Sequence, residues 1–316
     1  MKILLTGGSG MVGRNILDYA RTHGAAYQIY APTSNELNLL DRSSTEAYLL
    51  QHRPDLVIHC AGRVGGIQAN ISNPVSFLID NLDMARSILG AAHKARIKKV
   101  LNMGSSCMYP RDAENPLKED LVLKGELEPT NEGYAIAKVF AAKYASYIHR
   151  ENSDLKYKTL IPCNLYGRHD NFDPLSSHMI PAVIQKTHLA MKAGQPSVEI
   201  WGDGTARREF MDAYDLADFV FFAINNFDQV PEMINVGLGF DYSVNEYYEA
   251  VAKVVGYKGS FTHNLTKPVG MKRKLVSVER AAGLGWKSKT SLEEGIRRAY
   301  DYYLNLHLEK KGERHV

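Results

Sequence analysis

The chain has 316 residues, 45% of them hydrophobic, with 38 basic and 35 acidic side chains. This length and apolar content suit two ordinary domains, or one large domain with an appended lobe, and they exclude disorder and fibrous folds. The charges nearly balance and form no basic block, so nothing indicates a nucleic-acid or membrane-surface partner.

Short apolar runs alternate with longer amphipathic segments over the first half of the chain. The apolar runs resemble parallel strands covered on both faces, and they are Lys2–Thr6, Tyr27–Ala31, Asp55–Cys60, Lys98–Gly104 and Tyr157–Pro162. The segments between them have helical periodicity, and they are Val12–His23, Ser43–Gln51, Asn81–Ala95 and Asn131–Arg150. The repeated strand–helix unit predicts an α/β fold, a Rossmann-type doubly wound parallel sheet with right-handed crossovers.

The regular alternation stops near residue 165, where prolines and glycines divide the chain into shorter elements. We therefore expect a dinucleotide-binding Rossmann domain over residues 1–165. Residues 166–316 are expected to form mainly a smaller α/β substrate-binding lobe, with some segments returning to the first domain. No internal repeat, low-complexity segment or linker separates the two parts, so we expect them to share an interface.

Start and stop signals predict two helices in the second part. Ser243 and Glu246 form a capping box, and Gly256 ends the helix that they open. Ser291 and Glu294 form a second capping box, which opens the C-terminal helix.

Cysteine usage and apolar runs bear on the compartment. Cys60, Cys107 and Cys163 are odd in number and lack metal-ligand spacing, which predicts reduced thiols and no metal in a cytoplasmic protein. Ile3–Leu5 follows the first two residues directly, so the start does not have the pattern of a signal peptide. The longest obvious apolar run, Phe219–Ile224, is far shorter than the about 20 residues of a membrane span and suits a buried helix face.

A glycine-rich loop, Gly7-Gly-Ser-Gly-Met-Val-Gly13, follows the first strand and opens the first helix. Glycine at 7, 10 and 13 lets the backbone turn tightly, approach a pyrophosphate and pack the helix on the sheet, while the helix N-terminus offers free N–H groups to the anion. A glycine triplet alone is weak evidence for dinucleotide binding, because ordinary turns use glycine as well. Its place between strand and helix at the start of a βαβ series predicts dinucleotide binding.

The end of the second strand bears on the choice of dinucleotide. An acidic residue there binds a free ribose 2′-hydroxyl, and basic residues bind a 2′-phosphate. The sequence Ala31-Pro-Thr-Ser-Asn35 has neither, and the missing acid favours NADP(H). Thr33, Ser34 and the nearby Arg14 have donors for the phosphate. The competing interpretation is a solvated loop that is indifferent to it.

Tyr134 and Lys138 lie four residues apart at the start of a predicted helix, which places the phenol and the ammonium on one face. A nearby cation favours the phenolate and lowers the tyrosine pKa from about 10 toward the working pH, as a proton donor to a carbonyl requires. Ser105 lies at the end of a parallel strand, where such sheets bind ligands, so its hydroxyl can bond the same substrate oxygen. Without Ser105, the spacing would indicate only a helix surface.

The glycine loop, Ser105, Tyr134 and Lys138 together resemble the extended short-chain dehydrogenase/reductase superfamily. Finer motifs are similar to the GDP-L-fucose synthase family, whose members are GDP-4-keto-6-deoxy-mannose 3,5-epimerase/4-reductases. The resemblance runs from residue 1 to about 300. Its motifs are Glu36-Leu-Asn-Leu-Leu-Asp41, Val64-Gly-Gly-Ile67, Gly104-Ser-Ser-Cys-Met-Tyr-Pro110, Glu128-Pro-Thr-Asn-Glu132, Asn164-Leu-Tyr-Gly167, His169-Asp-Asn-Phe172, Ser177-His-Met-Ile-Pro181 and Trp201-Gly-Asp-Gly204.

The resemblance implies two kinds of chemistry on one ketone. Ser105, Tyr134 and Lys138 would serve the reduction, in which NADPH delivers hydride to C4 and Tyr134 protonates the alkoxide. Cys107 and His178 would serve as an acid/base pair for the epimerisations, because the C4 ketone acidifies the hydrogens on C3 and C5. In isolation Cys107 would be a small buried hydrophobe and His178 a loop histidine. The motifs around them favour catalytic roles.

The resemblance also implies binding residues and an assembly. The implied cofactor contacts are Gly7, Gly10, Met11, Val12, Gly13, Arg14, Ser34, Asp41, Ala61, Tyr134 and Lys138. Arg208 and Lys274 would face the diphosphate of the sugar nucleotide, Trp201 its nucleotide, and Lys186 stands where the family often has arginine. The competing interpretation of these basic residues is solvated surface charge. The family pattern further implies a homodimer.

Other functions share these motifs in part. A sister enzyme acting on another GDP-4-keto sugar, such as the precursor of GDP-L-colitose or a keto-heptose, would have the same site. A 4-epimerase or a 4,6-dehydratase also uses Tyr-x-x-x-Lys, but dehydratases have Asp-Glu where this chain has Ser106 and Cys107. A non-catalytic NADP sensor is the alternative from another class, and such proteins commonly lose the tyrosine or the lysine.

Overall fold

Six parallel strands form the central sheet of the computed structural model, which describes residues 1–23, 27–173, 176–267 and 270–312, with side chains to residue 306. Their order across the sheet is β10-β5-β4-β3-β1-β2. The strands are β1 (Lys2–Thr6), β2 (Gln28–Tyr30), β3 (Leu56–His59), β4 (Lys99–Met103), β5 (Lys156–Pro162) and β10 (Met233–Val236). The predicted α/β fold with a doubly wound parallel sheet is confirmed.

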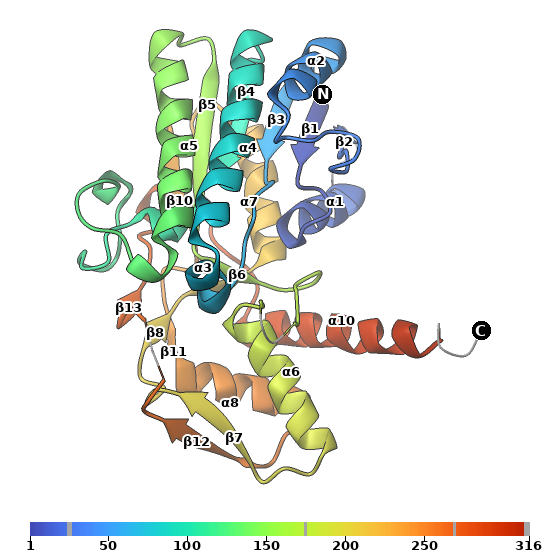
Figure 1. The fold of residues 1–316 in the computed structure, drawn as a ribbon, viewed down its shortest axis with the longest axis vertical. Helices are drawn as coiled ribbons and strands as arrows, with labels where there is room; N and C mark the ends of the chain where they lie inside the picture. The colour runs from blue at the N-terminus through green and yellow to red at the C-terminus, as the bar shows by residue number, and fades with distance from the viewer. Residues whose placement is uncertain (24–26, 174–175, 268–269, 313–316) are drawn as a thin grey trace.

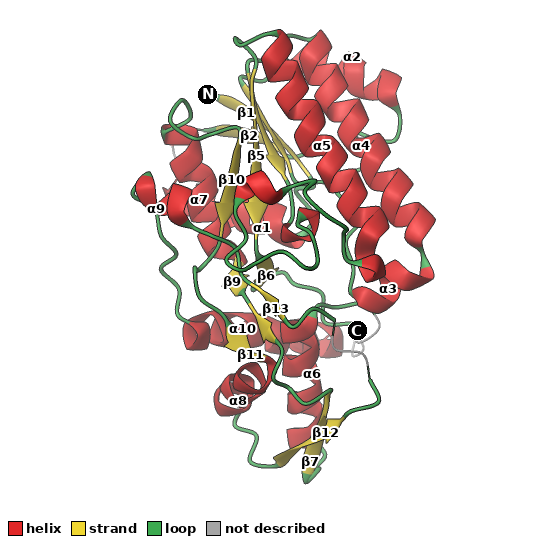
Figure 2. Cartoon of the chain, turned by 90° about the vertical axis from the view of Figure 1, so that its left-hand side faces the viewer, coloured by secondary structure: helices red, strands yellow, loops and turns green. Residues whose placement is uncertain are grey.

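Helices cover both faces of this sheet, as Figures 1 and 2 show. On one face α1 packs against α7, and on the other α4 packs between α2 and α5. These helices are α1 (Met11–His23), α2 (Arg42–His52), α4 (Pro74–Lys94), α5 (Glu132–Glu151) and α7 (Ala213–Asn225). The short α9 (Glu279–Gly283) contacts β10.

The apolar composition of the strands follows from this double cover. Ile3 and Leu5 of β1 belong to the core cluster on the α7 side, whereas Leu4 belongs to the cluster beneath α2, α4 and α5. Successive residues of a strand point to opposite faces, so a strand buried on both faces is apolar at most positions. The same division recurs in β3, where Val57 faces away from Leu56 and Ile58.

Helix α4 begins at Pro74, earlier than the predicted start at Asn81. Proline suits the first turn of a helix, where its missing N–H has no partner to lose. Asn81 lies inside the helix and is buried, and its Nδ2 donates to the carbonyl oxygens of Phe77 and Arg63 at 2.7 and 3.0 Å. This buried polar side chain interrupts the apolar periodicity and accounts for the error.

Segments from beyond residue 165 complete the central sheet. Strand β10 pairs with β5, with Met233 opposite Thr159. The apolar run Phe219–Ile224 lies within α7, where Phe219 and Val220 are fully buried, so the predicted buried helix face is confirmed. The central sheet therefore draws on both halves of the sequence, and the proposed division into domains stays a prediction.

A second lobe lies below the sheet in Figure 1. Its core of tyrosines and aliphatic side chains is held between α6, α8, α10 and β7. The elements of this lobe are α6 (Met179–Lys192), α8 (Val244–Val255), α10 (Leu292–Gly312), β7 (Ser197–Trp201) and β12 (Ser260–Asn264). Strands β7 and β12 pair in parallel.

Two smaller sheets join the second lobe to the central sheet. One has the order β11-β8-β13 and the other pairs β6 with β9. Their strands are β6 (Asn164–Tyr166), β8 (Arg207–Arg208), β9 (Phe210–Asp212), β11 (Tyr242–Ser243) and β13 (Arg273–Lys274). The remaining elements are α3 (Ile67–Ser72) and three 3-10 turns at Ser106–Met108, Glu119–Leu121 and Pro129–Asn131.

Both predicted capping boxes are present. At the start of α8 the Glu246 amide donates to Ser243 Oγ at 3.1 Å, and the Ser243 amide donates to the Glu246 carboxylate at 2.6 Å. Gly256 ends this helix with a φ of 87°. Ser291 and Glu294 exchange the same two bonds, at 3.0 and 3.3 Å, ahead of α10.

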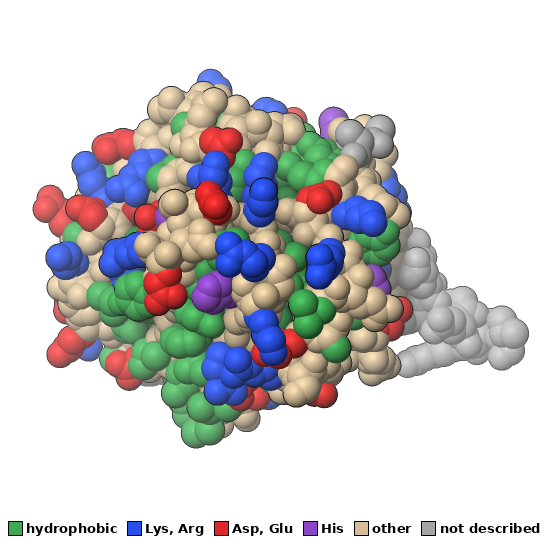
Figure 3. All heavy atoms as spheres, turned by 90° about the horizontal axis from the view of Figure 1, so that it is seen from above, with side chains coloured by type: hydrophobic (Ala, Val, Ile, Leu, Met, Phe, Trp, Pro, Cys, Tyr) green, Lys and Arg blue, Asp and Glu red, His purple; other side chains and the backbone are tan. Residues whose placement is uncertain are grey.

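The surface carries charges of both signs. Figure 3 shows Lys and Arg side chains interspersed with Asp and Glu over the face seen from above. Over the described ranges, no helix combines the length and the apolar character that crossing a membrane requires.

Candidate active site

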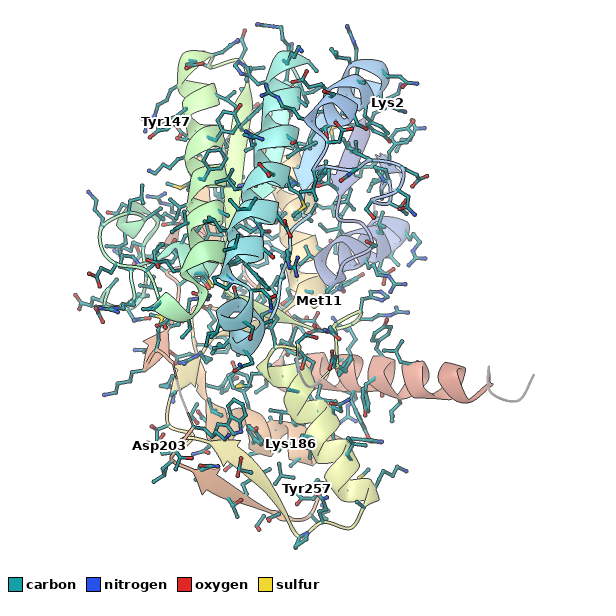
Figure 4. All side chains as sticks on the ribbon, viewed as in Figure 1. Lys2, Met11, Tyr147, Lys186, Asp203 and Tyr257 are labelled. Carbon is teal, nitrogen blue, oxygen red and sulfur yellow. The ribbon has the colours of Figure 1, made fainter. Side chains whose placement is uncertain are left out.

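The loops that follow β1 and β3 meet where the strand order reverses. The chain runs outward from β1 to β2 and then crosses to β3 on the other side of β1, and ligands of open α/β sheets bind at such a point. Figure 4 shows Met11, at the start of α1, at the end of the sheet that faces the second lobe, with Lys2 at the opposite end. The predicted dinucleotide loop therefore lies at the edge of the sheet nearest the lobe.

Glycine is required at Gly7 and Gly13 for reasons of space. Gly7 has a φ of 73°, and a Cβ there would lie 2.6 Å from the amide nitrogen of Ala61. A Cβ on Gly13 would lie 2.2 Å from the carbonyl oxygen of Gly7. Gly10 is exposed, and a Cβ there would meet only the Gly7 oxygen at 3.5 Å. The inner glycines allow the turn to pack, and Gly10 leaves its outer side open to a pyrophosphate beside the α1 N-terminus.

We expect Gly13→Ala to lower both stability and dinucleotide affinity, because the loop must move to admit the methyl group. Overpacking of this kind costs about 1–3 kcal/mol, and the displaced loop loses its approach to the pyrophosphate. Thermal unfolding and fluorescence titration with a reduced nicotinamide dinucleotide measure the two effects. Gly283→Ala is the matched control, because a Cβ there meets nothing within 4 Å. Unchanged dinucleotide affinity in Gly13→Ala would contradict the assignment of the loop.

The segment after β2 uses one of its predicted phosphate donors internally. The Thr33 amide and hydroxyl both donate to the Glu36 carboxylate, at 2.7 and 2.9 Å. Ser34 and Arg14 are exposed. Asp41 caps α2 by accepting from the amides of Ser43 and Ser44, at 3.0 and 3.1 Å. Of the three predicted donors, Ser34 and Arg14 are the ones that Glu36 does not engage, and the cofactor contacts of Ser34, Arg14 and Asp41 stay predictions.

Tyr134 and Lys138 lie on the first turns of α5, with Lys138 Nζ 5.7 Å from the centroid of the tyrosine ring. Lys138 is buried and donates to the carbonyl oxygen of Met103 at 2.8 Å. Burial lowers the pKa of Lys138 to about 8, although Cys60 and Cys107 act in the opposite direction.

The predicted fall in the pKa of Tyr134 is wrong in this structure. Burial, reinforced by the neighbouring Cys107, raises the pKa of the Tyr134 hydroxyl above its ordinary value, and a hydrogen bond with Ser105 opposes the rise only in part. The ammonium group of Lys138 is engaged by the Met103 carbonyl rather than by the phenol oxygen. The tyrosine is therefore held in its neutral form, which is the form that donates a proton to an alkoxide.

Ser105 links the two predicted catalytic pairs. It caps the turn Ser106–Met108, and its Oγ accepts from the Cys107 amide at 3.2 Å. Its hydroxyl also hydrogen-bonds the Tyr134 side chain and the Cys107 thiol. The side chains assigned by resemblance to reduction and to epimerisation thus meet at one hydroxyl.

Two donors from distant parts of the chain reach the Cys107 sulfur. Asn131 Nδ2 lies 3.1 Å from Sγ, and Lys274 Nζ lies 3.4 Å from it. Burial by itself raises the pKa of Cys107, but the Lys274 charge and hydrogen bonds from Ser105, Lys274 and Asn131 outweigh burial, so its pKa lies below the ordinary value. The sequence assigned Lys274 to the diphosphate and gave Asn131 no role. Only its place in the motif Glu128–Glu132 marked Asn131.

His178 lies on the loop that enters α6 and is half-buried. Burial, together with the Lys274 charge, lowers the pKa of its imidazole. The loop ahead of His178 is tied to the segment before α3 by a bond from the Gly66 amide to the Ser176 carbonyl at 3.1 Å. Lys274 therefore acts electrostatically on both members of the predicted acid/base pair.

The predicted substrate residues fall into two pairs. Arg208 is opposite Lys274 where β8 pairs with β13, and its Nη1 donates to the carbonyl of Arg207 at 2.8 Å. Lys186 lies on α6 (Figure 4) and donates to the Glu199 carbonyl of β7, the strand that ends at Trp201. The Trp201 side chain is 52% exposed. Of these residues, Lys274 contacts Cys107. The substrate roles of all four residues stay predictions.

Comparisons with known proteins agree with this geometry. Residues 3–237 match the NAD dependent epimerase/dehydratase family. The GDP-L-colitose synthase of Yersinia pseudotuberculosis is 55% identical over 305 residues, which cover 96% of this chain and 98% of that protein. The GDP-L-fucose synthase of Azorhizobium caulinodans is 48% identical over 303 residues, 96% of each protein.

A solved structure shares the fold along nearly the whole chain. The GDP-mannoheptose C4 reductase MlghC from Campylobacter jejuni, with NADP bound, superposes with a TM-score of 0.86 at 29% identity. The superposition covers 96% of this chain and 98% of that chain.

Proposed function

Because the chain belongs to the NAD dependent epimerase/dehydratase family, we propose that it is an NADPH-dependent epimerase and reductase of a GDP-4-keto-6-deoxy sugar. The observation that carries the proposal is the meeting of Tyr134 and Cys107 at the Ser105 hydroxyl. Relatives named for GDP-sugar synthesis, at 55% and 48% identity, support the substrate class. A neighbouring structure with NADP bound supports the cofactor.

In the reduction, the protein has to bind the ketone and protonate the oxygen on C4. When bound, the reduced nicotinamide supplies the hydride for C4. Ser105 donates to the C4 oxygen, and Tyr134 passes its phenolic proton to the alkoxide as it forms. Lys138, held near the phenol by the Met103 carbonyl, favours the phenolate that remains. The outer face of the loop at Gly10 and the N-terminus of α1 fit the cofactor pyrophosphate.

In the epimerisation, Cys107 removes a proton next to the C4 ketone and His178 returns one on the opposite face. The C–H electron pair moves into the carbonyl, which gives an enolate whose oxygen Ser105 can bond. Donation by His178 requires the protonated imidazole. Burial and Lys274 lower the pKa of His178, so its protonated fraction is lost at a lower pH than that of an ordinary histidine.

The first candidate product is GDP-L-fucose, formed by inversion at C3 and C5 and reduction at C4. The second is GDP-L-colitose, which the 55% identity to the synthase of that name favours. A 3-deoxy substrate has no stereocentre at C3, so only C5 is inverted. The two candidates use the same residues and differ in whether the site accepts a C3 hydroxyl.

Incubation with each GDP-4-keto sugar and NADPH tests the proposal, with the product sugar identified by NMR. We expect consumption of one equivalent of NADPH for each L-sugar formed. The substrate with the higher kcat/KM decides between the two candidates. Cofactor binding without turnover of either sugar would instead indicate the non-catalytic sensor.

The enzyme is expected to prefer NADPH over NADH. An acidic residue directly after β2 would repel a 2′-phosphate, and this chain has none in the segment Ala31–Asn35. Ser34→Arg should raise the ratio of kcat/KM for NADPH to that for NADH by about tenfold or more, since a new charge-assisted bond contributes about 1.5–3 kcal/mol. Ser34→Gln is the control, because it adds length without charge. A wild-type enzyme that uses NADH equally well would contradict the expectation.

A further inference from the structure

The sulfur of Cys107 is the acceptor of two donors that come from different elements. Asn131 ends the 3-10 turn ahead of α5, and Lys274 lies on β13, next to the second lobe. Their nitrogens lie 3.1 and 3.4 Å from Sγ. A neutral thiol is a weak acceptor, whereas a thiolate accepts charge-assisted bonds, so two donors at one sulfur favour the anion.

Three charged or titratable side chains interact electrostatically with this sulfur. From β13 comes the Lys274 ammonium, and from α5 come Lys138 and Tyr134, both of which interact electrostatically with Cys107. The negative sulfur raises the pKa of both α5 groups, which keeps Lys138 charged and Tyr134 protonated. An anion at Cys107 thus agrees with the protonation that the reduction requires.

The backbone that directly follows Lys274 is fixed by hydrogen bonds to the side chains of Asn115 and Glu209. The Leu275 amide donates to Asn115 Oδ1 at 2.7 Å, and the Val276 amide donates to the Glu209 carboxylate at 2.9 Å. Glu209 is fully buried and also accepts from the amides of Leu238 and Gly239. The lysine is therefore presented to Cys107 by a strand whose following residues are anchored.

We propose that Lys274 and Asn131 are positioning residues that hold Cys107 as a thiolate, and so supply the base for epimerisation. The inference rests on the proposed function. In the step it serves, the thiolate forms an S–H bond with the hydrogen of C3 or C5, the C–H bond breaks, and its electron pair enters the C4 carbonyl. Lys274 and Asn131 exchange no proton with the sugar. They stabilise the negative charge of the Cys107 sulfur, which removes the proton.

Alkylation of Cys107 by iodoacetamide as a function of pH measures the thiolate directly. Cys107→Ser gives the background, which should be low because burial raises the pKa of Cys60 to about 12 and raises that of Cys163 well above its ordinary value. Lys274→Met should move the alkylation midpoint upward by about one to three pH units, the effect of a charge within about 4–6 Å. Lys274→Arg keeps the charge, so its alkylation midpoint should lie close to that of the wild type.

Further variants separate this effect from a general loss of charge or structure. Lys272→Met removes an exposed lysine two residues away and should leave the midpoint unchanged. Asn131→Leu removes a donor without changing charge and should raise the midpoint by less than Lys274→Met does. In Lys274→Met, the exchange of the sugar's C3 or C5 hydrogen with solvent should recover as the pH is raised toward the new alkylation midpoint of Cys107. A misfolded protein would not show this recovery.

An alkylation midpoint that is the same in Lys274→Met and the wild type, with unchanged circular dichroism, would overturn the inference. The proposed function has a separate test, because alkylation does not depend on turnover. If the wild type incorporates no solvent deuterium into the sugar but Lys274→Met shifts the midpoint, Cys107 is a thiolate without an epimerase role. The two failures are therefore distinguishable.

Discussion

Cys107→Ser should abolish the incorporation of solvent deuterium into the product sugar, with a loss of about 10²–10⁴-fold in exchange rate. A base that removes the C3 or C5 proton exchanges it with solvent, so the wild type working in deuterated water should label each carbon that it inverts. Serine has nearly the size of cysteine, but its hydroxyl is too weak an acid to become a base near neutrality. Mass spectrometry and NMR of the product measure the label and its position.

The hydride step should survive this substitution. Ser105, Tyr134 and Lys138 remain, so Cys107→Ser should still reduce the un-inverted ketone slowly. Cys163→Ser is the control, because Cys163 is buried elsewhere in the core cluster beneath α7. Normal labelling and a normally inverted sugar from Cys107→Ser would show that the thiol is structural. The enzyme would then be a 4-reductase with another epimerisation base, or with none.

Tyr134→Phe should remove the reduction, with a fall of about 10²–10⁴-fold in turnover and little change in NADPH affinity. The substitution deletes the hydroxyl that protonates the C4 alkoxide but keeps the ring. The dinucleotide is expected to lie against the glycine loop, which this side chain does not form. NADPH oxidation measured by absorbance, with NADPH binding measured by fluorescence, separates the two effects.

Tyr147→Phe is the matched control for this variant. Tyr147 lies on the same helix, is 52% exposed, and stands at the far end of α5 from the second lobe in Figure 4. Turnover in Tyr134→Phe close to the wild-type value would exclude the proton-donor role. Tyr134→Phe should still exchange deuterium while Cys107→Ser should still reduce, so the two variants together resolve the two half-reactions.

The strand pattern and the glycine loop were predictable because their physical causes are local. A strand buried on both faces is apolar at most positions. The run Ile3-Leu4-Leu5 therefore indicates a doubly covered strand even when the elements packed against it are unknown. The glycines of the loop mark a turn whose requirements follow from its own backbone, as the φ of 73° at Gly7 shows. Capping boxes span three residues and are equally local. The sequence did not predict the start of α4 at Pro74, because the buried Asn81 interrupts the apolar pattern of this helix.

The environment of the site depended on contacts between distant residues. The sequence identified Tyr134 and Lys138 through their spacing, but burial determined that the pKa of Tyr134 rises instead of falling. Desolvation reflects every atom packed around a group, and that packing comes from several elements at once.

Sequence by itself determined the α/β architecture, the dinucleotide loop and the Tyr134–Lys138 pair, because each follows from short-range periodicity or spacing. Cys107 and His178 were identified through the resemblance to a family. Only the tertiary structure brought Lys274 to Cys107, since the two are 167 positions apart in the chain. That contact requires β13 to pair with β8 beside the carboxyl edge of the central sheet. An electrostatic interaction over 3.4 Å depends on distance in space, which residue spacing does not encode across elements.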